Sequence, residues 1–144
     1  MDFGTSVRVG CSAERAFDLM ADARNEVRWN SAVSRSELLT SEPVGAGSRF
    51  LTVNRGQEYN ATIASFERPG RLVFEVTGKQ MDITASFTFS AEGAGTIVEE
   101  HLDFHPKSLM KVVFPLMAPF VRRDLPKQGA RFKALCEASV SPEA

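Results

Sequence analysis

Four turn-like stretches divide the middle of the chain into short segments, and this division constrains the fold more than any other feature. They read P-V-G-A-G at 43–47, N-R-G-Q at 54–57, E-R-P-G at 67–70 and A-E-G-A-G at 91–95. The segments around them are strand-like, over about 33–40, 48–54, 57–67, 71–77, 80–90 and 95–104. Because the connections are short, neighbouring strands are expected to pair antiparallel as a meander.

A strand and two short helices are predicted before this meander. Residues 3–10 alternate around Val7 and Val9, which is typical of a strand. Ser12 is the expected N-cap of a helix that carries Phe17, and Asp22 is the expected cap of a second helix over about 23–31.

A long helix is predicted after the meander, from Lys107 to about Ala138. Its apolar residues recur on one side: Leu109, Val113, Leu116 or Met117, Phe120, Phe132 and Leu135. Three prolines, Pro115, Pro119 and Pro126, predict kinks or a break near 115–126. A curved antiparallel sheet with this helix across its concave face would bury both apolar surfaces, so the predicted fold class is α+β.

Length, charge and cysteine content exclude several classes of protein. The 144 residues fit a single domain over 1–144, and the net charge of −1 argues against nucleic acid as the main partner. No apolar run is long enough to span a membrane, and the N-terminus lacks the apolar segment of a secretory signal, so a cytoplasmic location is expected. Cys11 and Cys136 are expected to be small buried residues rather than a disulfide or zinc site.

Several stretches together resemble one superfamily. S-V-R-V-G-C-S-A-E-R-A-F-D-L-M-A-D is similar to the first strand and helix of the START/polyketide-cyclase-like (SRPBCC) superfamily, and Trp29 stands where that superfamily often has a tryptophan. P-V-G-A-G-S-R-F, A-T-I-A-S-F-E-R-P-G-R-L-V-F-E-V and G-T-I-V-E-E-H-L-D-F-H-P resemble later strands in the same order. The resemblance implies a helix-grip fold of about seven strands, a cavity roofed by the C-terminal helix, and a hydrophobic ligand.

Strand alternation predicts which residues face that cavity. On 81–89 the apolar set runs from Met81 to Phe89, and on 95–104 Glu100 falls among apolar residues of the inner face. The resemblance alone places Phe50 and Asn54 inward on their strand. The candidate ligand-binding residues are Trp29, Phe50, Tyr59, Ile63, Phe74, Met81, Ile83, Phe87, Glu100, Leu102, Val113, Met117 and Phe120.

Glu100 has two interpretations. An ionised carboxylate is costly inside an apolar cavity, so Glu100 either reaches solvent at a strand bend or faces the ligand at a wet part of the cavity. The alternation puts His101 and His105 on the outer face, about 13 Å apart at ~3.3 Å per residue, which is too far to share a metal ion. No metal site and no cofactor are predicted, and the sequence has no nucleophile elbow or phosphate-binding loop.

Two other features also have more than one interpretation. Trp29 can be a structural anchor at the cavity mouth, a ligand contact or a surface recognition residue. The segment 108–123 either covers the core as a lid or is a surface-seeking amphipathic stretch with flanking Lys111, Arg122 and Arg123.

Three functions remain open at the level of sequence. The first is binding of a lipid, polyketide or isoprenoid-like molecule by a monomer or weak homodimer. The second is a cyclase- or dehydratase-like enzyme that uses Glu100 as acid or base, with Tyr59 as a hydrogen-bond donor. The third is a partner-binding or stress-related protein with a vestigial cavity.

Overall fold

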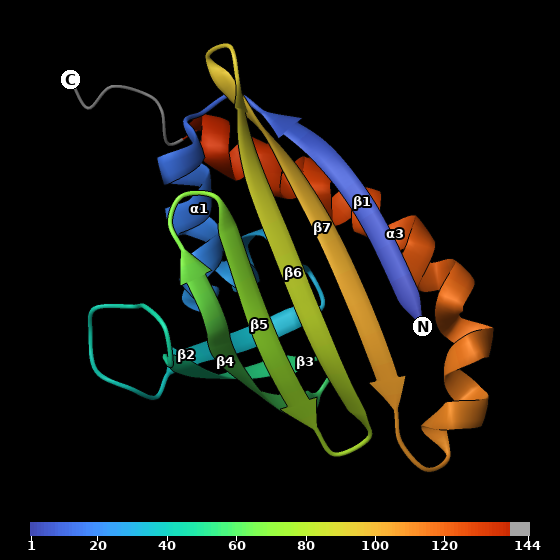
Figure 1. The fold of residues 1–144 in the computed structure, drawn as a ribbon. Helices are drawn as coiled ribbons and strands as arrows, with labels where there is room; N and C mark the ends of the chain where they lie inside the picture. The colour runs from blue at the N-terminus through green and yellow to red at the C-terminus, as the bar shows by residue number, and fades with distance from the viewer. Residues whose placement is uncertain (139–144) are drawn as a thin grey trace.

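Within residues 1–138, the part of the chain that the computed structural model describes, seven strands form one antiparallel sheet beside a long helix (Figure 1). The strands are β1 (Asp2–Val9), β2 (Val33–Leu38), β3 (Arg49–Asn54), β4 (Gln57–Glu67), β5 (Arg71–Gly78), β6 (Met81–Glu92) and β7 (Gly95–Pro106). The helices are α1 (Ala13–Ala21), the 3-10 helix η1 (Ala23–Asn25), α2 (Glu26–Trp29) and α3 (Met110–Ala138). The predicted α+β helix-grip fold is confirmed.

The strand order in the sheet is β1-β7-β6-β5-β4-β3-β2, so every neighbour is also consecutive in the chain except for β1 and β7. Figure 1 shows β2 and β3 running across the direction of β6 and β7, which makes the sheet strongly curved. The turn between β3 and β4 has two residues, Arg55 and Gly56, with φ of 51° and 78°. Two positive φ values are what a tight hairpin with the correct twist requires.

The short helices begin where the sequence predicts. The Ser12 hydroxyl accepts a hydrogen bond from the Arg15 backbone N–H at 3.1 Å and caps α1, which buries Phe17 against the sheet. Asp22 accepts one from the Arg24 backbone N–H at 3.1 Å and caps η1.

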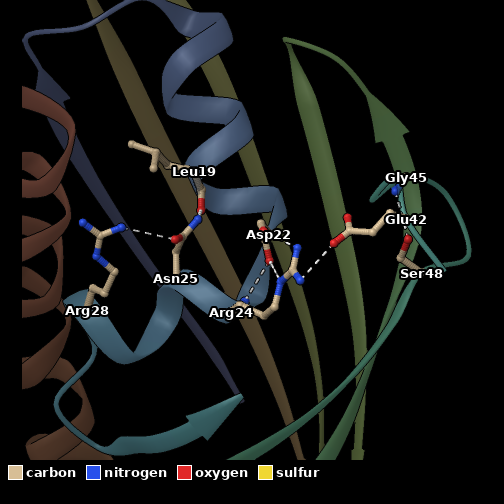
Figure 2. A network of polar contacts seen from close by, with 8 residues as sticks. All are labelled: Leu19, Asp22, Arg24, Asn25, Arg28, Glu42, Gly45 and Ser48. Carbon is tan, nitrogen blue, oxygen red and sulfur yellow. Dashed lines mark hydrogen bonds and ion pairs between the residues drawn. The ribbon is translucent and has the colours of Figure 1, made fainter. Parts of the chain in front are cut away.

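A polar network joins these helices to the loop between β2 and β3 (Figure 2). Arg24 donates from Nε and Nη2 to the two carboxylate oxygens of Asp22, both at 2.9 Å, while its Nη1 lies 3.0 Å from Glu42 Oε2. Asn25 donates to the backbone carbonyl of Leu19 at 3.1 Å. The end of the helical segment is therefore held on one side by α1 and on the other by the β2–β3 loop.

The expected interruption of the C-terminal helix is only partly correct. Helix α3 runs continuously from Met110 to Ala138 with Pro115, Pro119 and Pro126 inside it, so there is no break. All three prolines are exposed, and Figure 1 shows the helix changing direction along its length. Proline has no backbone N–H, so each one leaves a carbonyl oxygen of the preceding turn without its helical hydrogen bond. Because the prolines are on the exposed side of the helix, water can bind these oxygens, and a bend costs less free energy than a break.

The predicted apolar side of α3 also needs correction. Leu109, Leu116 and Phe120 point to solvent, whereas Phe114, Ala118 and Leu125 are buried. In this part of the helix apolar residues recur at helical spacing on two different sides, so the sequence pattern does not tell which side faces the sheet. Further along, Phe132 is buried as predicted, and Leu135 packs partly buried against the core.

Two clusters of buried side chains make up the core. The larger one gathers Phe17, Phe50, Leu72 and Phe132, and the smaller one gathers Phe3, Met81, Phe114 and Leu125 among others. Cys11 and Cys136 are both buried as free thiols, as predicted, and a hydrogen bond joins them. Burial raises the pKa of both thiols, which disfavours the thiolate form that would act as a nucleophile.

Candidate functional site

A cavity of about 250 Å³ lies between the concave face of the sheet, helix α2 and the first half of α3. Residues of both core clusters contribute to its walls. The sheet supplies Thr52, Asn54, Tyr59, Ala61, Phe74, Val76, Met81, Ile83, Ala85, Phe87, Glu100, Leu102 and Phe104. The helices and connecting segments supply Met20, Ala23, Glu26, Trp29, Asn30, Arg55, Met110, Phe114, Met117, Val121, Asp124, Leu125 and Gln128.

Strand alternation produces the apolar wall as predicted. Residues 81, 83, 85 and 87 of β6 all line the cavity, and Phe74 and Val76 of β5 lie beside them. The predicted inward face of β3 is also confirmed, because Phe50 is fully buried while Thr52 and Asn54 reach the cavity.

Most of the candidate ligand-binding residues line the cavity: Trp29, Tyr59, Phe74, Met81, Ile83, Phe87, Glu100, Leu102 and Met117. Four candidates do not. Phe50 and Ile63 are core residues next to the wall, with exposures of 0% and 1%, because the cavity ends before their strand positions. Val113 and Phe120 sit on turns of α3 whose cavity-facing residues are Phe114, Met117 and Val121.

Glu100 lines the cavity in the middle of β7, so the interpretation as a solvent-directed residue at a strand bend does not hold. Its alternate neighbours on the same face, Val98 and Leu102, pack in the core, which fixes the direction of the side chain. Burial and, to a smaller extent, the charge of Glu26 raise the pKa of Glu100 to about 7.

The cavity contains a second carboxyl group that was not predicted from the sequence. Glu26 lies on α2 and also lines the cavity, but it is not among the candidate residues from the sequence. Burial raises its pKa to about 7, against the lowering effect of a hydrogen bond from Asn30 Nδ2 to its Oε2 at 3.1 Å. The sequence does contain a signal for this position of Glu26. Glu26 and Trp29 are three residues apart, a spacing that places both side chains on one face of a helical turn.

Asn30 fixes the position of the Glu26 carboxyl. Its side chain is 6% exposed, and while its Nδ2 donates to Glu26, its Oδ1 accepts a hydrogen bond from the Ala32 backbone N–H at 3.1 Å. Both ends of the amide are therefore engaged. The corresponding carboxyl of Glu100 forms no hydrogen bond to any residue within 1–138, so it is available to a polar group of a ligand.

Trp29 packs edge-on against Phe132 of α3, with ring centroids 5.7 Å apart, and is 8% exposed. It also lines the cavity beside Glu26. The buried position excludes the third interpretation, a surface recognition residue. Trp29 is an anchor between α2 and α3 that also presents an edge to the cavity.

Tyr59 enters the cavity from β4, where burial raises the pKa of its phenol. It pairs in register with Gly78 of β5, and a Cβ atom at position 78 would lie 2.5 Å from Tyr59 Cε1. The missing side chain at Gly78 is thus what lets the ring lie flat against the neighbouring strand.

An ion pair lies at the edge of the cavity. Arg55, in the turn between β3 and β4, places Nη2 3.4 Å from Asp124 Oδ2 on α3, and both residues belong to the lining. Both are partly exposed, so the pair links the sheet to the helix where the cavity meets solvent.

The outer face of β7 carries the two histidines, as predicted. His101 lies 3.6 Å from Asp2, and His105 lies 2.9 Å from Asp103, both as exposed side chains. Within residues 1–138 no group of three or more histidine, cysteine or acidic side chains is arranged to hold a metal ion, and no helix is long and apolar enough to cross a membrane.

Comparison with known proteins identifies the family. A family model described as "Polyketide cyclase / dehydrase and lipid transport" matches residues 2–137. The chain belongs to this polyketide cyclase/dehydrase and lipid-transport family. The predicted kinship with the START-like superfamily is thereby confirmed. No curated protein matches the chain.

Structures that resemble this family member share its fold at low sequence identity. A START superfamily protein from Mycobacterium smegmatis has a TM-score of 0.72 and 17% identity, over 93% of this chain and 98% of that one. A protein from Thermus thermophilus has a TM-score of 0.74 and 16% identity, over 98% of this chain and 100% of that one. The di-domain ARO/CYC BexL from the BE-7585A biosynthetic pathway has a TM-score of 0.69 and 17% identity, over 100% of this chain and 51% of BexL.

Proposed function

We propose that the chain binds a hydrophobic small molecule, of lipid, polyketide or isoprenoid type, in the cavity between the sheet and α3. The observation that carries this proposal is the open volume of about 250 Å³ with a mainly apolar lining. A vestigial cavity would be filled by its own Phe and Met side chains. Ligand sites are typically of ~300–1,000 Å³, so this cavity suits a small ligand or one ring system of a larger ligand.

The two carboxyls narrow the ligand class further. Glu26 and Glu100 face the same cavity, and the cation among the lining residues, Arg55, is already paired with Asp124. A carboxyl group that stays without a partner in such a place costs free energy, whereas a hydrogen-bond donor on the ligand would stabilise it. The best ligand therefore has an apolar body and a hydroxyl or amine group, and a free fatty acid is a poor one.

The family description and the likeness to an ARO/CYC protein support the same ligand class. The family description names polyketides and lipids, and both classes include molecules that combine a hydrocarbon or aromatic body with hydroxyl or carbonyl groups.

The test is ligand binding by two matched variants. Ala85 lines the cavity, and its neighbour Ser86 lies on the opposite face of β6. Ala85→Phe fills the cavity and should abolish binding of the neutral apolar dye N-phenyl-1-naphthylamine, whereas Ser86→Phe adds the same side chain outside and should leave binding unchanged. Native mass spectrometry of freshly purified protein would then name a co-purified ligand. Equal dye binding by both variants would refute the proposal.

A second function, proton transfer on a bound substrate, is favoured by Glu100. A pKa of about 7 lets one carboxyl both donate and accept a proton near neutral pH. With Tyr59 as a hydrogen-bond donor in the same cavity, this arrangement suits a cyclisation or dehydration. Glu100→Gln should abolish turnover of such a substrate and retain its binding; unchanged turnover would rule out this role.

A further inference from the structure

The outer face of the first half of α3 exposes a row of large apolar side chains. Leu109, the residue directly before α3, and Val112, Leu116 and Phe120 within it are 73%, 69%, 74% and 59% exposed. Their spacing of three and four residues places them on one side of the helix, which we call the outer row. A helix that packs on a protein core normally turns polar residues to water on this side.

The outer row does not contribute to the core. The opposite side of the same turns buries Phe114 and Ala118 and brings Met110, Met117 and Val121 to the cavity. Packing of the helix is thus complete without the outer row, and its apolar character needs another explanation.

Cations border the outer row, and acids are missing from this part of the sequence. No Asp or Glu occurs from residue 104 to residue 123. Lys111, Arg122 and Arg123 are exposed there, and none of them forms an ion pair with a residue in 1–138. The Arg123 guanidinium lies over the Phe120 ring, 5.2 Å from its centroid, which joins one cation directly to the apolar row.

Arg122 lies over the Phe3 ring, 5.1 Å from its centroid, and its charge also has no acidic partner in the described part of the chain. An apolar row bordered by cations without acidic partners in residues 1–138 matches the surface of an anionic membrane. The apolar side chains can enter the boundary between headgroups and acyl chains while the cations contact the headgroups. A second copy of the chain fits less well, because a two-fold interface would place the same uncompensated cations opposite one another.

We propose that the outer row of α3, with Lys111, Arg122 and Arg123, docks on anionic lipid membranes. The docking is peripheral and reversible. Because α3 lines the cavity with its inner side, docking places the roof of the cavity on the membrane surface. The docking surface and the cavity use different side chains, so each can be tested without the other.

The test is flotation of the intact protein with lipid vesicles. Mixed phosphatidylcholine–phosphatidylglycerol vesicles should bind the protein at least about tenfold better than pure phosphatidylcholine vesicles, and added salt should weaken this binding. The double variant Leu116→Ser/Phe120→Ser should lower binding to the mixed vesicles about tenfold or more. The triple variant Lys111→Gln/Arg122→Gln/Arg123→Gln should remove the preference for the anionic lipid.

A matched control uses exposed apolar residues elsewhere. Val27 and Leu39 are 42% and 45% exposed and lie outside α3, so Val27→Ser/Leu39→Ser should bind vesicles as the native protein does. All variants change exposed side chains, and thermal unfolding should confirm that they fold. Absence of vesicle binding would overturn the proposal, as would equal loss in both double variants. A third outcome would also overturn the proposal: the native protein does not bind vesicles but elutes as a dimer from a sizing column, and of the variants only Leu116→Ser/Phe120→Ser dissociates this dimer. The outer row would then be an interface with a second copy of the chain.

Discussion

Glu26 on helix α2 and Glu100 on strand β7 line the same cavity, and the charge of Glu26 helps to raise the pKa of Glu100 to about 7. Two carboxyls in one largely apolar space cannot both ionise easily near neutral pH, because each is desolvated and each repels the other. The pair therefore takes up and releases protons near pH 7.

Removing one carboxyl should change the titration of the other. In Glu26→Gln the repulsion is absent, so the pKa of Glu100 should fall below 7 but stay above 4.5, since burial remains its larger cause. Carbon-detected NMR of the Glu side-chain carboxyls would measure it. Glu99→Gln, a change on the outer face of the same strand, is the control and should leave the Glu100 titration unchanged. An identical pKa in Glu26→Gln would show that the two groups are not coupled.

The same pair should make the fold less stable as pH rises. Their pKa values are raised from 4.5 to about 7 in the folded state, so the folded protein holds more protons than the unfolded chain between these values. The free energy of unfolding therefore falls as pH rises through this window and levels off above it. Each of the two carboxyls contributes on the order of 3 kcal/mol to this change.

Urea unfolding at pH 4.5 and pH 8 would measure this contribution as a difference between the native chain and Glu26→Gln/Glu100→Gln. The difference cancels the contributions of the other titrating groups, because these groups are the same in both chains. The double variant should gain stability relative to the native chain at pH 8. A constant difference at both pH values would contradict the assigned pKa shifts.

The contact between Gly78 and Tyr59 should make Gly78→Ala costly. The added methyl group would lie 2.5 Å from Tyr59 Cε1 and 2.9 Å from the Met81 carbonyl oxygen, so the ring and the strand must shift. We expect a loss of about 1–3 kcal/mol in the free energy of unfolding and a displaced Tyr59 in the cavity. Gly45→Ala is the control, because no atom lies within 4 Å of a Cβ there and the loss should be near zero. Equal stability of the two variants would show that Tyr59 is free to move.

The ion pair between Arg55 and Asp124 should affect the rates of ligand exchange more than stability. Asp124→Asn keeps the shape of the side chain but removes the attraction across the edge of the cavity, so association and dissociation should both become faster. The stability should change by less than about 1 kcal/mol, since the pair is partly exposed. Stopped-flow fluorescence with N-phenyl-1-naphthylamine would measure both rates.

Asp18→Asn serves as the comparison for this prediction. This change breaks the ion pair between Asp18 and Arg68, in which Arg68 Nε lies 2.7 Å from the Asp18 carboxylate. Neither residue of this pair lines the cavity. Unaltered exchange rates in Asp124→Asn, or equal acceleration in both variants, would argue against a role of the Arg55–Asp124 pair at the entrance.

The sequence predicted the sheet well because alternation along the strands is a local property. The apolar set of β6, from Met81 to Phe89, is buried on one face of the sheet in the structure, and Glu100 follows the same rule. Sequence reasoning was weaker where the direction of a side chain depends on tertiary contacts. Glu26 faces the cavity because Trp29, one turn later, packs on Phe132, a contact over one hundred residues along the chain.

Helix α3 shows a second limit. Its first half is apolar on two sides, so the sequence alone does not say whether Leu116 or Met117 faces the sheet. The structure shows Met117 at the cavity and Leu116 at the surface. Ambiguity of this kind is expected where a helix has two apolar faces, one against the cavity and one exposed to solvent.

The pairing of β1 with β7 has a consequence for how the chain reaches its fold. The first strand is made first, but its hydrogen-bonded neighbour arrives about a hundred residues later: the Met1 amino group meets the Phe104 carbonyl at 2.9 Å across 103 positions in sequence. The consecutive hairpins from β2 to β7 can form as they are synthesised, whereas β1 has no partner in the sheet until β7 is complete. Closure of the sheet between β1 and β7, followed by α3 packing against β1, is therefore expected to be the late and slow part of folding.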